Sequence, residues 1–471
     1  MHETLRTSAL SSARTEGLAV LRREVTGGVF VPGQPGYADE SRRYNLLAPL
    51  EPEVVVSAAR AEDVRAAVRF AVAHGMPVAV KNSGHQMVSA AHGGVLVTTR
   101  RMKGISIDAR RRRARVEAGV IWQEVIDEAA QHGLAPLSGS APDVGVAGYT
   151  LGGGQSPVLG RSLGYAADHV HSLDVVTADG KLRTVTAESE PDLFWALRGC
   201  KGNFGVVTAL EFELFPISRF YGGSLYFEGT HLAEILHAWR GWVTGLPVEA
   251  TSSIAVQRLP PLPELPAPLR GANVVHLRYA HLGSEQEAER LLAPMRAAAP
   301  AVLDAVSELP YTASRRIHND PEDPMPYWDR TTSLRALPAE AVDAFVEVLG
   351  PESGSPLVNV EIRCLGGAFD REPAVANAVS TRGVPFVVFG FGVGGPDQAE
   401  LMRGSLAAVI DALAPWSDGR RMTNFLSPDE ATSPADMEEV FGPERYARLV
   451  EIKKAYDPTN VFRLNHNIPA A

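Results

Sequence analysis

Two short segments of the chain combine glycine with small polar side chains and could together hold an anionic cofactor. The first is the segment Lys-Asn-Ser-Gly-His-Gln at residues 81–86, which follows the predicted strand Val78–Lys81. Small polar residues and a glycine at the end of a strand form a plausible backbone nest for phosphate. His85 stands at the edge of this nest. Composition alone, with 13 histidines in the chain, favours an ordinary surface or core position for it.

The second segment, Gly139 to Gly154, contains six glycines in sixteen residues. Glycine permits positive φ and close backbone approach, so successive N–H groups can converge on an anion or a flat ring. A flexible loop is the simple alternative, but the glycines alternate with Val144, Val146 and Leu151, which favours buried backbone. A Rossmann fingerprint fits poorly, because residues 135–143 form no central strand and the glycines continue where a helix should begin.

The elements that must position these segments indicate two lobes, as does the length of 471 residues. Residues 52–216 alternate short β-rich runs with brief helices, and Asp179-Gly180 joins two of these runs with a strong hairpin signal. From about Arg219 longer amphipathic helices alternate with strands, which is typical of an α+β lobe. The tail carries a further helix that ends at Asp457-Pro458.

Composition argues against several classes of function. A formal net charge of −10 is unlike that of a general nucleic-acid binder, and the only basic run, Arg110–Arg113, is typical of a solvated hairpin tip. Two cysteines, Cys200 and Cys364, make no disulfide framework, and no CxxC pair indicates a metal or redox dithiol. Neither a signal peptide nor a membrane-spanning stretch is found, so we expect a cytoplasmic protein without metal, membrane or nucleic-acid partners.

Four ordered motifs resemble the berberine-bridge-enzyme-like flavoproteins of the vanillyl-alcohol-oxidase superfamily. They are Ser83-Gly-His85, Val144-Gly-Val-Ala-Gly-Tyr-Thr-Leu-Gly-Gly-Gly154, Arg198-Gly-Cys-Lys-Gly-Asn-Phe-Gly-Val-Val-Thr208 and Tyr456-Asp-Pro-Thr-Asn-Val-Phe-Arg-Leu-Asn-His-Asn467. The resemblance spans about residues 45–217 and 440–469. It implies an α+β fold with an N-terminal leader (1–44), a two-lobed PCMH-type FAD-binding domain (45–217), a substrate-binding domain with an antiparallel sheet (218–424) and a C-terminal segment that completes the FAD domain (425–471).

In this family the histidine after Ser-Gly carries FAD covalently, so the resemblance implies that His85 is the attachment point. A bond from the flavin's methyl group to imidazole withdraws electron density and makes the flavin more oxidising. The resemblance also implies contacts with the pyrophosphate, the ring, the ribityl chain and the adenine. These contacts come from Lys81, Asn82, Ser83, Gly84, Gln86, Ser140, Val144, Gly145, Gly148, Tyr149, Gly152, Gly153, Gly154, Asn203, Gly205, Val207, Asn465 and Asn467.

Three departures from the family pattern bear on the chemistry. Many relatives attach the flavin a second time through a cysteine, where this chain has Ala141, so one covalent link is expected. Cys200 is interpreted as a packed residue. Well-known members place a tyrosine base where this chain has Met422, which cannot accept a proton. Arg382 follows a threonine where the family often has His-Arg, and we predict a contact between Arg382 and the substrate.

Glu361 is the nearest surrogate for the missing base. The predicted strand Val358–Arg363 alternates in character, which would aim Asn359, Glu361 and Arg363 at one face of a sheet. A plain ion pair between Glu361 and Arg363 is the alternative interpretation.

The chemistry that the resemblance implies is oxidation of a small alcohol, lactol or polyphenol. A base takes a proton while hydride passes to the flavin, and dioxygen then accepts the electrons to give peroxide. The missing cysteine and tyrosine also suit an oxygenase similar to the enterocin-pathway member, with Ser140 and Tyr149 bordering the place where oxygen meets the ring. A flavin-loaded but catalytically idle protein is the third alternative.

Overall fold

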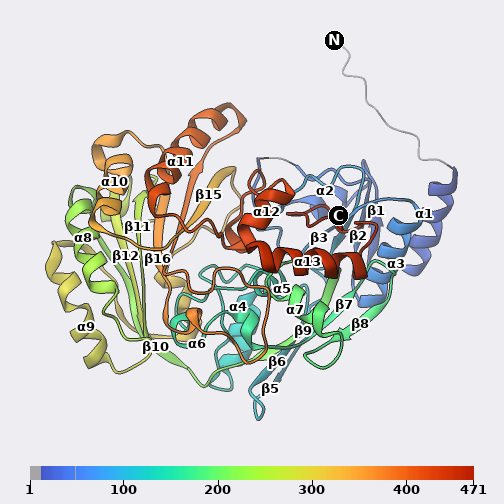
Figure 1. The fold of residues 1–471 in the computed structure, drawn as a ribbon, viewed down its shortest axis with the longest axis horizontal. Coiled ribbons are helices and arrows are strands. Elements are labelled where there is room, and N and C mark those ends of the chain that lie inside the picture. Colours follow the sequence, from blue (N-terminus) through green and yellow to red (C-terminus); the bar gives the residue numbers. More distant parts are fainter. Residues whose placement is uncertain (1–11, 48, 471) are drawn as a thin grey trace.

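Runs of valine and other β-branched residues form the strands of the N-terminal lobe, because such side chains pack well on a pleated surface. The computed structural model describes residues 12–47 and 49–470, and this lobe lies on the right in Figure 1. Its first sheet is parallel except at the edge strand β1. In spatial order its strands are β1 (Gly28–Phe30), β2 (Val54–Ser57), β4 (Val95–Thr98) and β3 (Val78–Lys81).

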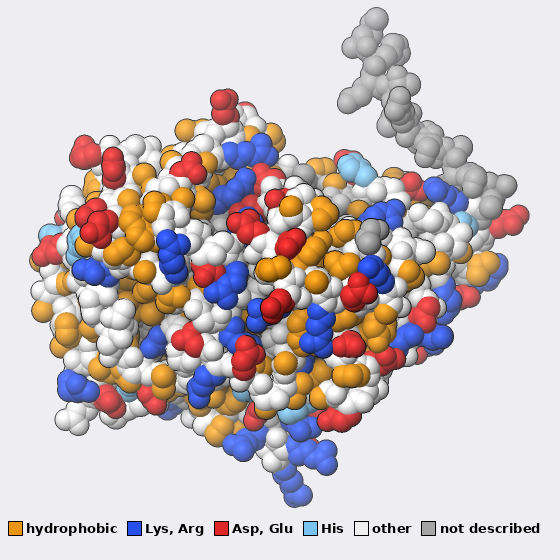
Figure 2. All heavy atoms as spheres, in the orientation of Figure 1, with side chains coloured by type: hydrophobic (Ala, Val, Ile, Leu, Met, Phe, Trp, Pro, Cys, Tyr) orange, Lys and Arg blue, Asp and Glu red, His pale blue; other side chains and the backbone are white. Residues whose placement is uncertain are grey.

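The second sheet of this lobe is antiparallel and contains both predicted hairpins. The Asp179-Gly180 turn joins β7 to β8, with Gly180 at φ 72°. Figure 2 shows basic side chains gathered at the tip of the β5–β6 hairpin, where Arg110–Arg112 are exposed as predicted. In spatial order the strands are β5 (Ile105–Asp108), β6 (Arg113–Glu117), β9 (Val206–Glu213), β7 (Val170–Val176) and β8 (Leu182–Val185).

Helices pack on both sheets. They are α1 (Ser12–Glu24), α2 (Tyr37–Ser41), α3 (Ala61–Ala73), α4 (Trp122–Ala130), α5 (Val146–Leu151) and α7 (Pro191–Leu197), whereas α6 (Gly160–Leu163) packs against β11 (Ala250–Arg258) of the middle lobe. Residues 12–41, from the region predicted as a leader, supply α1, β1 and α2, and β1 pairs with β2. A short helix, α5, does follow Gly145, where the sequence predicted none. No sheet strand leads into it, since Gly145 makes only an isolated bridge to Ile121, so a Rossmann unit is not formed.

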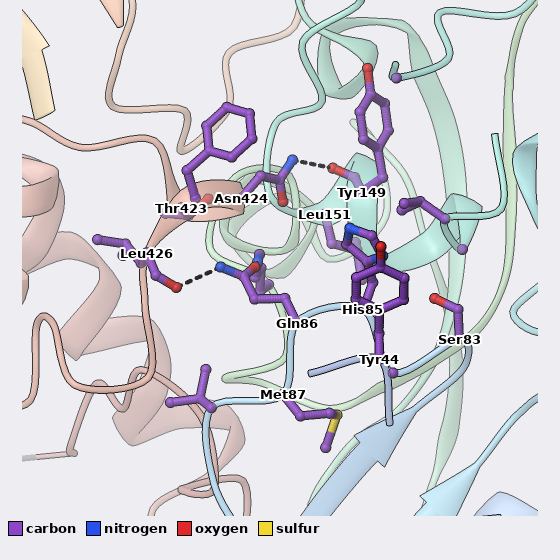
Figure 3. A pocket seen from close by; sticks show the side chains of 18 of the residues that line it. Tyr44, Ser83, His85, Gln86, Met87, Tyr149, Leu151, Thr423, Asn424 and Leu426 are labelled. Atoms are coloured by element: carbon purple, nitrogen blue, oxygen red, sulfur yellow. Dashed lines mark hydrogen bonds between the residues drawn. The ribbon is translucent and has the colours of Figure 1, made fainter. Parts of the chain in front are cut away.

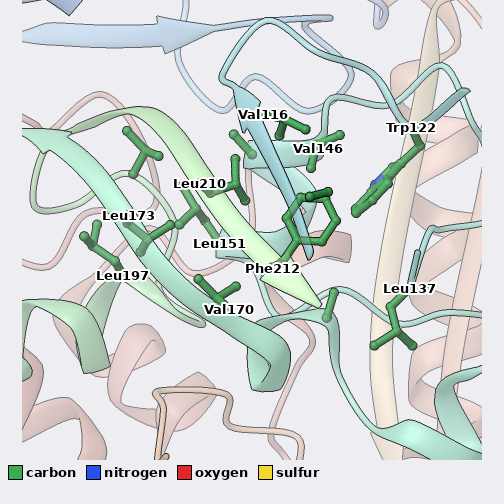
Figure 4. Packing of buried hydrophobic residues seen from close by; sticks show 14 of the residues in the cluster. Val116, Trp122, Leu137, Val146, Leu151, Val170, Leu173, Leu197, Leu210 and Phe212 are labelled. Atoms are coloured by element: carbon green, nitrogen blue, oxygen red, sulfur yellow. The ribbon is translucent and has the colours of Figure 1, made fainter. Parts of the chain in front are cut away.

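The core of this lobe lies between the second sheet and helices α4, α5 and α7. The Trp122 ring meets the Phe212 ring edge-on, with centres 5.6 Å apart. Burying one such large apolar side chain stabilises a fold by about 1.5–3 kcal/mol. Figure 4 shows side chains from strands and helices interleaved in this core, among them Val116, Trp122, Leu137, Val146, Leu151, Val170, Leu173, Leu197, Leu210 and Phe212.

The middle lobe is built on one large antiparallel sheet, on the left in Figure 1. In spatial order its strands are β13 (Ala301–Asp304), β10 (Arg219–Glu228), β12 (Asn273–His281), β11 (Ala250–Arg258), β16 (Asn359–Cys364), β17 (Phe386–Val393) and β15 (Tyr327–Leu334), with β14 (Ser307–Pro310) also paired to β10. One face is covered by α8 (Leu232–Val243), α9 (Glu285–Ala298), α10 (Ala339–Leu349) and α11 (Ala399–Leu413).

Strand alternation divides β16 between the two faces of this sheet. Val360, Ile362 and Cys364 pack among the hydrophobic residues of the helices. Asn359, Glu361 and Arg363 therefore point to the opposite face, which turns toward the N-terminal lobe. The polar side chains on this strand are therefore buried by the N-terminal lobe, which covers this face of the sheet.

The C-terminal segment returns to the N-terminal lobe through α12 (Pro434–Phe441) and α13 (Pro443–Tyr456). The Lys453 ammonium donates to the Asn203 carbonyl and to Asp457, both at 2.7 Å. The Asn203 side chain in turn donates to the His466 carbonyl at 3.0 Å and accepts from the Ile468 N–H at 3.0 Å. The predicted α+β fold is confirmed, whereas the residue boundaries of its domains stay a prediction. No described helix is both long and apolar enough to cross a bilayer.

Candidate active site

A cavity of about 380 Å³ lies where the two lobes and the C-terminal segment meet. The N-terminal lobe contributes the loop after β3, the glycine segment around α5 and the loop before β9. The middle lobe contributes the faces of β12, β15, β16 and β17, and residues 422–426 and 464–466 line the remaining side. The predicted cofactor residues on the lining are Lys81, Asn82, Ser83, Gly84, His85, Gln86, Ser140, Val144, Gly145, Gly148, Tyr149, Asn203, Gly205, Val207 and Asn465.

The loop after β3 forms one end of this cavity. Gly84 has φ 73°, a left-handed conformation that glycine adopts without strain. The Lys81 ammonium donates to the Arg42 carbonyl at 2.5 Å, and burial lowers the pKa of Lys81 to about 8. The loop therefore presents a glycine turn beside a cation, which suits a phosphate group.

His85 lies inside the cavity next to Tyr44, with ring centres 4.4 Å apart (Figure 3). The Tyr327 hydroxyl donates to the His85 carbonyl at 3.3 Å. Burial lowers the pKa of His85 and outweighs the opposite effect of the negative charges of Asp143 and Asp320, while the positive charge of Lys201 lowers it further. The imidazole is therefore neutral at neutral pH, and one ring nitrogen keeps the lone pair that a covalent bond to carbon requires.

The glycines of the second segment have two different roles. A Cβ at Gly145 would lie 2.6 Å from the Asn82 side chain, whereas a Cβ at Gly148 would meet no protein atom within 4 Å. Gly148 thus leaves open space inside the cavity. Gly152–Gly154 do not line it, contrary to the prediction, because the chain turns after α5 to pack on the middle lobe. A Cβ at Gly152 would lie 1.9 Å from the Asn424 Oδ1.

Asn465 and Asn467 also differ in position. Asn465 lines the cavity and donates to the Gly202 carbonyl at 3.1 Å, while its own Oδ1 is buried without a partner. A buried acceptor without a donor is costly, so Asn465 suits a bound group that brings an N–H. Asn467 does not line the cavity, although its Oδ1 is also buried without a partner, and its contact with the cofactor stays a prediction.

The sheet face of the cavity carries a network of charges centred on Glu361. Its carboxylate accepts from the Arg363 Nε at 2.7 Å and from a guanidinium nitrogen of Arg278 on β12. Burial alone would raise the pKa of Glu361, but the two guanidiniums hold it below its usual value. Protonation would leave two buried cations unpaired, so Glu361 is a poor proton acceptor. The ion-pair interpretation describes it better than the role of base.

Asp329 on β15 is a second carboxyl group on this face, and sequence reasoning missed it. It lies opposite Phe391 of β17, and the Ser427 hydroxyl donates to its Oδ1 at 2.5 Å. Its neighbour Arg330 pairs instead with Asp429 at 2.7 Å. Burial raises the pKa of Asp329 to about 7. The only signal in the sequence is its place in the alternating strand Tyr327–Leu334.

Comparison with known proteins identifies the family. Residues 52–186 match a family model described as FAD binding domain, and residues 423–469 match one described as berberine and berberine like. The chain is 31% identical over 459 residues to (R)-6-hydroxynicotine oxidase of Paenarthrobacter nicotinovorans, covering 94% of this chain and 97% of that protein. The chain belongs to the berberine-bridge-enzyme-like FAD-linked oxidoreductases.

Solved structures show that this family fold covers the whole chain. The crystal structure of 6-hydroxy-D-nicotine oxidase from Arthrobacter nicotinovorans matches with a TM-score of 0.79 and 26% identity, over 95% of this chain and 98% of that one. Xylooligosaccharide oxidase from Myceliophthora thermophila C1 matches with a TM-score of 0.83 and 22% identity, over 98% and 100%. The second likeness concerns the fold alone. This protein is thus an FAD-dependent oxidoreductase, and its cavity residues fit that cofactor through the neutral His85, the space at Gly148 and the unpartnered Asn465 Oδ1.

The tyrosine base of well-known family members has no replacement among the described phenols of this oxidoreductase. Met422 lines the cavity where that tyrosine is expected, and Asn424 donates to the Tyr149 carbonyl at 2.9 Å (Figure 3). Burial raises the pKa of Tyr44, Tyr149 and Tyr327, which also line the cavity. The Tyr149 hydroxyl is buried without a partner, so its tentative catalytic role gains no proton path.

Both cysteines are buried thiols with raised pKa values. Cys200 lines the cavity, and burial raises the pKa of its thiol to about 12, so it stays protonated and unreactive. Cys364 is buried on the helix side of β16, and burial raises its pKa to about 11. Ala141, which has no thiol, also lines the cavity.

Arg382 lies away from the cavity, and the predicted contact with substrate is withdrawn. Its guanidinium pairs with Asp168 at 2.6 Å and donates to the Arg371 carbonyl at 2.7 Å. The same group lies over the Tyr165 ring, 5.3 Å from the ring centre. Arg382 therefore joins the middle lobe to the N-terminal lobe, and its donors are used in doing so.

Proposed function

We propose that this chain is an oxidase that holds FAD by one covalent bond, at His85, and removes hydride from a small organic substrate. The observation that carries the proposal is the neutral imidazole of His85. It lies inside a cavity whose one end, the loop after β3, suits a phosphate group. Ala141 has no thiol and Cys200 has an unreactive one, which supports one link rather than two.

FAD, when bound, supplies the acceptor for a hydride, that is, for two electrons and one proton. Residues 81–84 would hold its phosphates, and Gly205 and Val207 its adenine end. Gly145 and Gly148 would let the flavin ring approach the backbone closely. The Asn465 Oδ1 would accept a hydrogen bond that no protein donor now supplies.

We assign the removal of the substrate's proton to Asp329 in place of Glu361. The Asp329 carboxyl contacts a hydroxyl rather than guanidiniums, and its pKa of about 7 matches a group that must both accept and release a proton. Arg278 and Arg363 keep Glu361 ionised, so Glu361 serves to hold those two guanidiniums in place.

The lining favours a substrate with a flat or apolar body that carries a hydroxyl group. Phe389 and Phe391 of β17 and Phe425 of the C-terminal side face the cavity, and the Phe389 and Phe425 ring centres are 4.9 Å apart. Aromatic walls with a few polar groups are typical of sites for small organic molecules. An aromatic alcohol, lactol or polyphenol fits this description, with dioxygen as the electron acceptor.

An oxygenase is the second candidate, and the absence of a phenol at Met422 favours it. Turnover under ¹⁸O-labelled dioxygen, with an aromatic alcohol that the enzyme oxidises, separates the two functions. An oxidase should return the label as peroxide, one per substrate oxidised, and should leave none in the organic product. Label in the organic product would contradict the oxidase.

Peptide mass spectrometry of the denatured protein tests the anchor. Trypsin should release residues 82–100 as one peptide, which contains both His85 and the exposed His92. We expect one flavin mass on this peptide, and fragmentation should locate it on His85. His85→Ala should abolish the covalent flavin, while the matched control His92→Ala should retain it. Flavin on any other peptide would falsify the single-link proposal.

A further inference from the structure

Lys201 is a buried cation whose backbone is held in an unusual conformation. It has φ 56°, in the left-handed region where a residue with a Cβ is strained by about 1–2 kcal/mol. Its N–H donates to the Leu151 carbonyl at 3.0 Å, and the Gly199 N–H donates to the same oxygen at 2.9 Å. Strain of this kind persists where the surroundings fix it, and it clusters at functional sites.

The Lys201 side chain lines the cavity, and its hydrogen-bond partner is an amide. Its ammonium donates to the Gln86 Oε1, and the Gln86 Nε2 donates to the Leu426 carbonyl at 2.5 Å, which fixes the amide (Figure 3). Gln86 follows His85 directly in the chain. Lys201 is therefore held beside the attachment point that we propose for the flavin.

No carboxylate balances this charge among the residues that the structure describes. The positive charge of Lys201 acts on two histidines, His85 and His466, and lowers the pKa of both. Burial is the single cause that lowers the pKa of Lys201 itself, to about 7. Another buried lysine of the same lobe interface, Lys453, contacts Asp457 at 2.7 Å.

A buried charge without a counter-charge is costly, and proteins keep one where a ligand or reaction supplies the opposite charge. We propose that the Lys201 ammonium stabilises the negative charge that the flavin gains on reduction. The inference rests on the proposed function, since it requires FAD at His85. Hydride brings two electrons and one proton to the oxidised flavin, which leaves one net negative charge for the ammonium to neutralise. No proton needs to leave Lys201.

Sulfite is a probe of this charge that requires no substrate. It adds to the oxidised flavin ring and leaves the ring negatively charged, so its affinity reports a cation nearby. We expect Lys201→Met to weaken sulfite binding at least tenfold and to lower the two-electron midpoint potential by about 30 mV, the equivalent of a tenfold change. Lys201→Arg, which keeps the charge, should retain most of the sulfite affinity and most of the midpoint potential of the native protein.

Controls separate this role from a structural one. Lys103→Met removes an exposed lysine that pairs with Glu124, and it should change neither readout. Covalent flavin on the His85 peptide is measured in every variant, so failure of the anchor is seen separately from failure of Lys201. Equal sulfite affinity in the native protein and in a flavin-loaded Lys201→Met variant would overturn the inference.

The native holoenzyme provides a second measurement if Lys201→Met does not fold or load flavin. A cation that is partly deprotonated above pH 7 should take up a proton when the flavin becomes negative. Reduction should then consume one proton below pH 7 and two above it. The slope of midpoint potential against pH should steepen from about 30 to about 59 mV per pH unit. A slope that stays constant or flattens contradicts the inference.

Discussion

The two walls of the cavity are built in opposite ways. The wall from the N-terminal lobe comes from short contiguous segments rich in glycine and small side chains, and Gly148 leaves open space in it. The sheet wall consists of charged side chains from β12, β15 and β16, and Arg278, Glu361 and Arg363 bind one another there. The N-terminal wall depends on the open space that it leaves for a ligand. The sheet wall depends on mutual contacts, so none of Arg278, Glu361 and Arg363 can change without leaving a buried charge unpaired.

The largest expected effect lies in the sheet wall, at Glu361→Gln. Removing the carboxylate leaves two buried guanidiniums unpaired, which should lower the free energy of unfolding by about 3–5 kcal/mol. Urea unfolding of the purified protein measures it. Glu308→Gln is the matched control, because Glu308 pairs with Arg219 at the surface and should cost about 0.5 kcal/mol. Equal losses in the two variants would remove the contrast between the walls.

A pH-dependent effect is expected at Asp329→Asn. The pKa of Asp329 is about 7 in the folded protein, above the usual value of 3.8. The folded state therefore binds the carboxyl proton more tightly than the unfolded state does. The stability that this proton contributes is complete below pH 4 and is lost as the pH rises to 7. Each unit of pKa difference is worth about 1.36 kcal/mol, so this loss of stability amounts to at most about 4 kcal/mol.

The measurement is the difference in melting temperature between Asp329→Asn and the native protein at pH 5 and pH 8. The melting temperature of the variant should rise relative to that of the native protein at pH 8, because asparagine does not ionise. A difference that is the same at both pH values would show that Asp329 titrates normally. Asp429→Asn is the control, since Asp429 pairs with Arg330 and Arg403, which lower its pKa. It should lose stability at pH 8.

The smallest effect on stability, with a large effect on the cofactor, is expected at Gly148→Val. A side chain there meets no protein atom, and valine is the better helix former, so the unfolding free energy should change by less than about 1 kcal/mol. The new methyl groups occupy the cavity, so covalent flavin should fall to a small fraction. Gly241→Val, on an exposed position of α8, should keep full flavin content. Absorbance of the denatured protein gives that content, and normal loading in Gly148→Val would contradict the open-space role.

The sequence by itself determined the residues whose neighbours lie close in the chain. Ser83-Gly84-His85 follows its strand directly, and period-two alternation was enough to place Asn359, Glu361 and Arg363 on one face of β16. Local patterns of this kind need no knowledge of distant contacts. They were sufficient for the fold class and the family, and most of the residues that they singled out line the cavity.

Only the tertiary structure decided what the charged groups do. Glu361 meets Arg278 across 83 residues, Asp329 meets Ser427 across 98, and Lys201 meets Gln86 across 115. A pKa depends on burial and on partners within a few ångströms, and a strand pattern specifies neither. The sequence therefore predicted a carboxylate on the right face of the sheet, whereas folding determined which carboxylate is free to accept a proton.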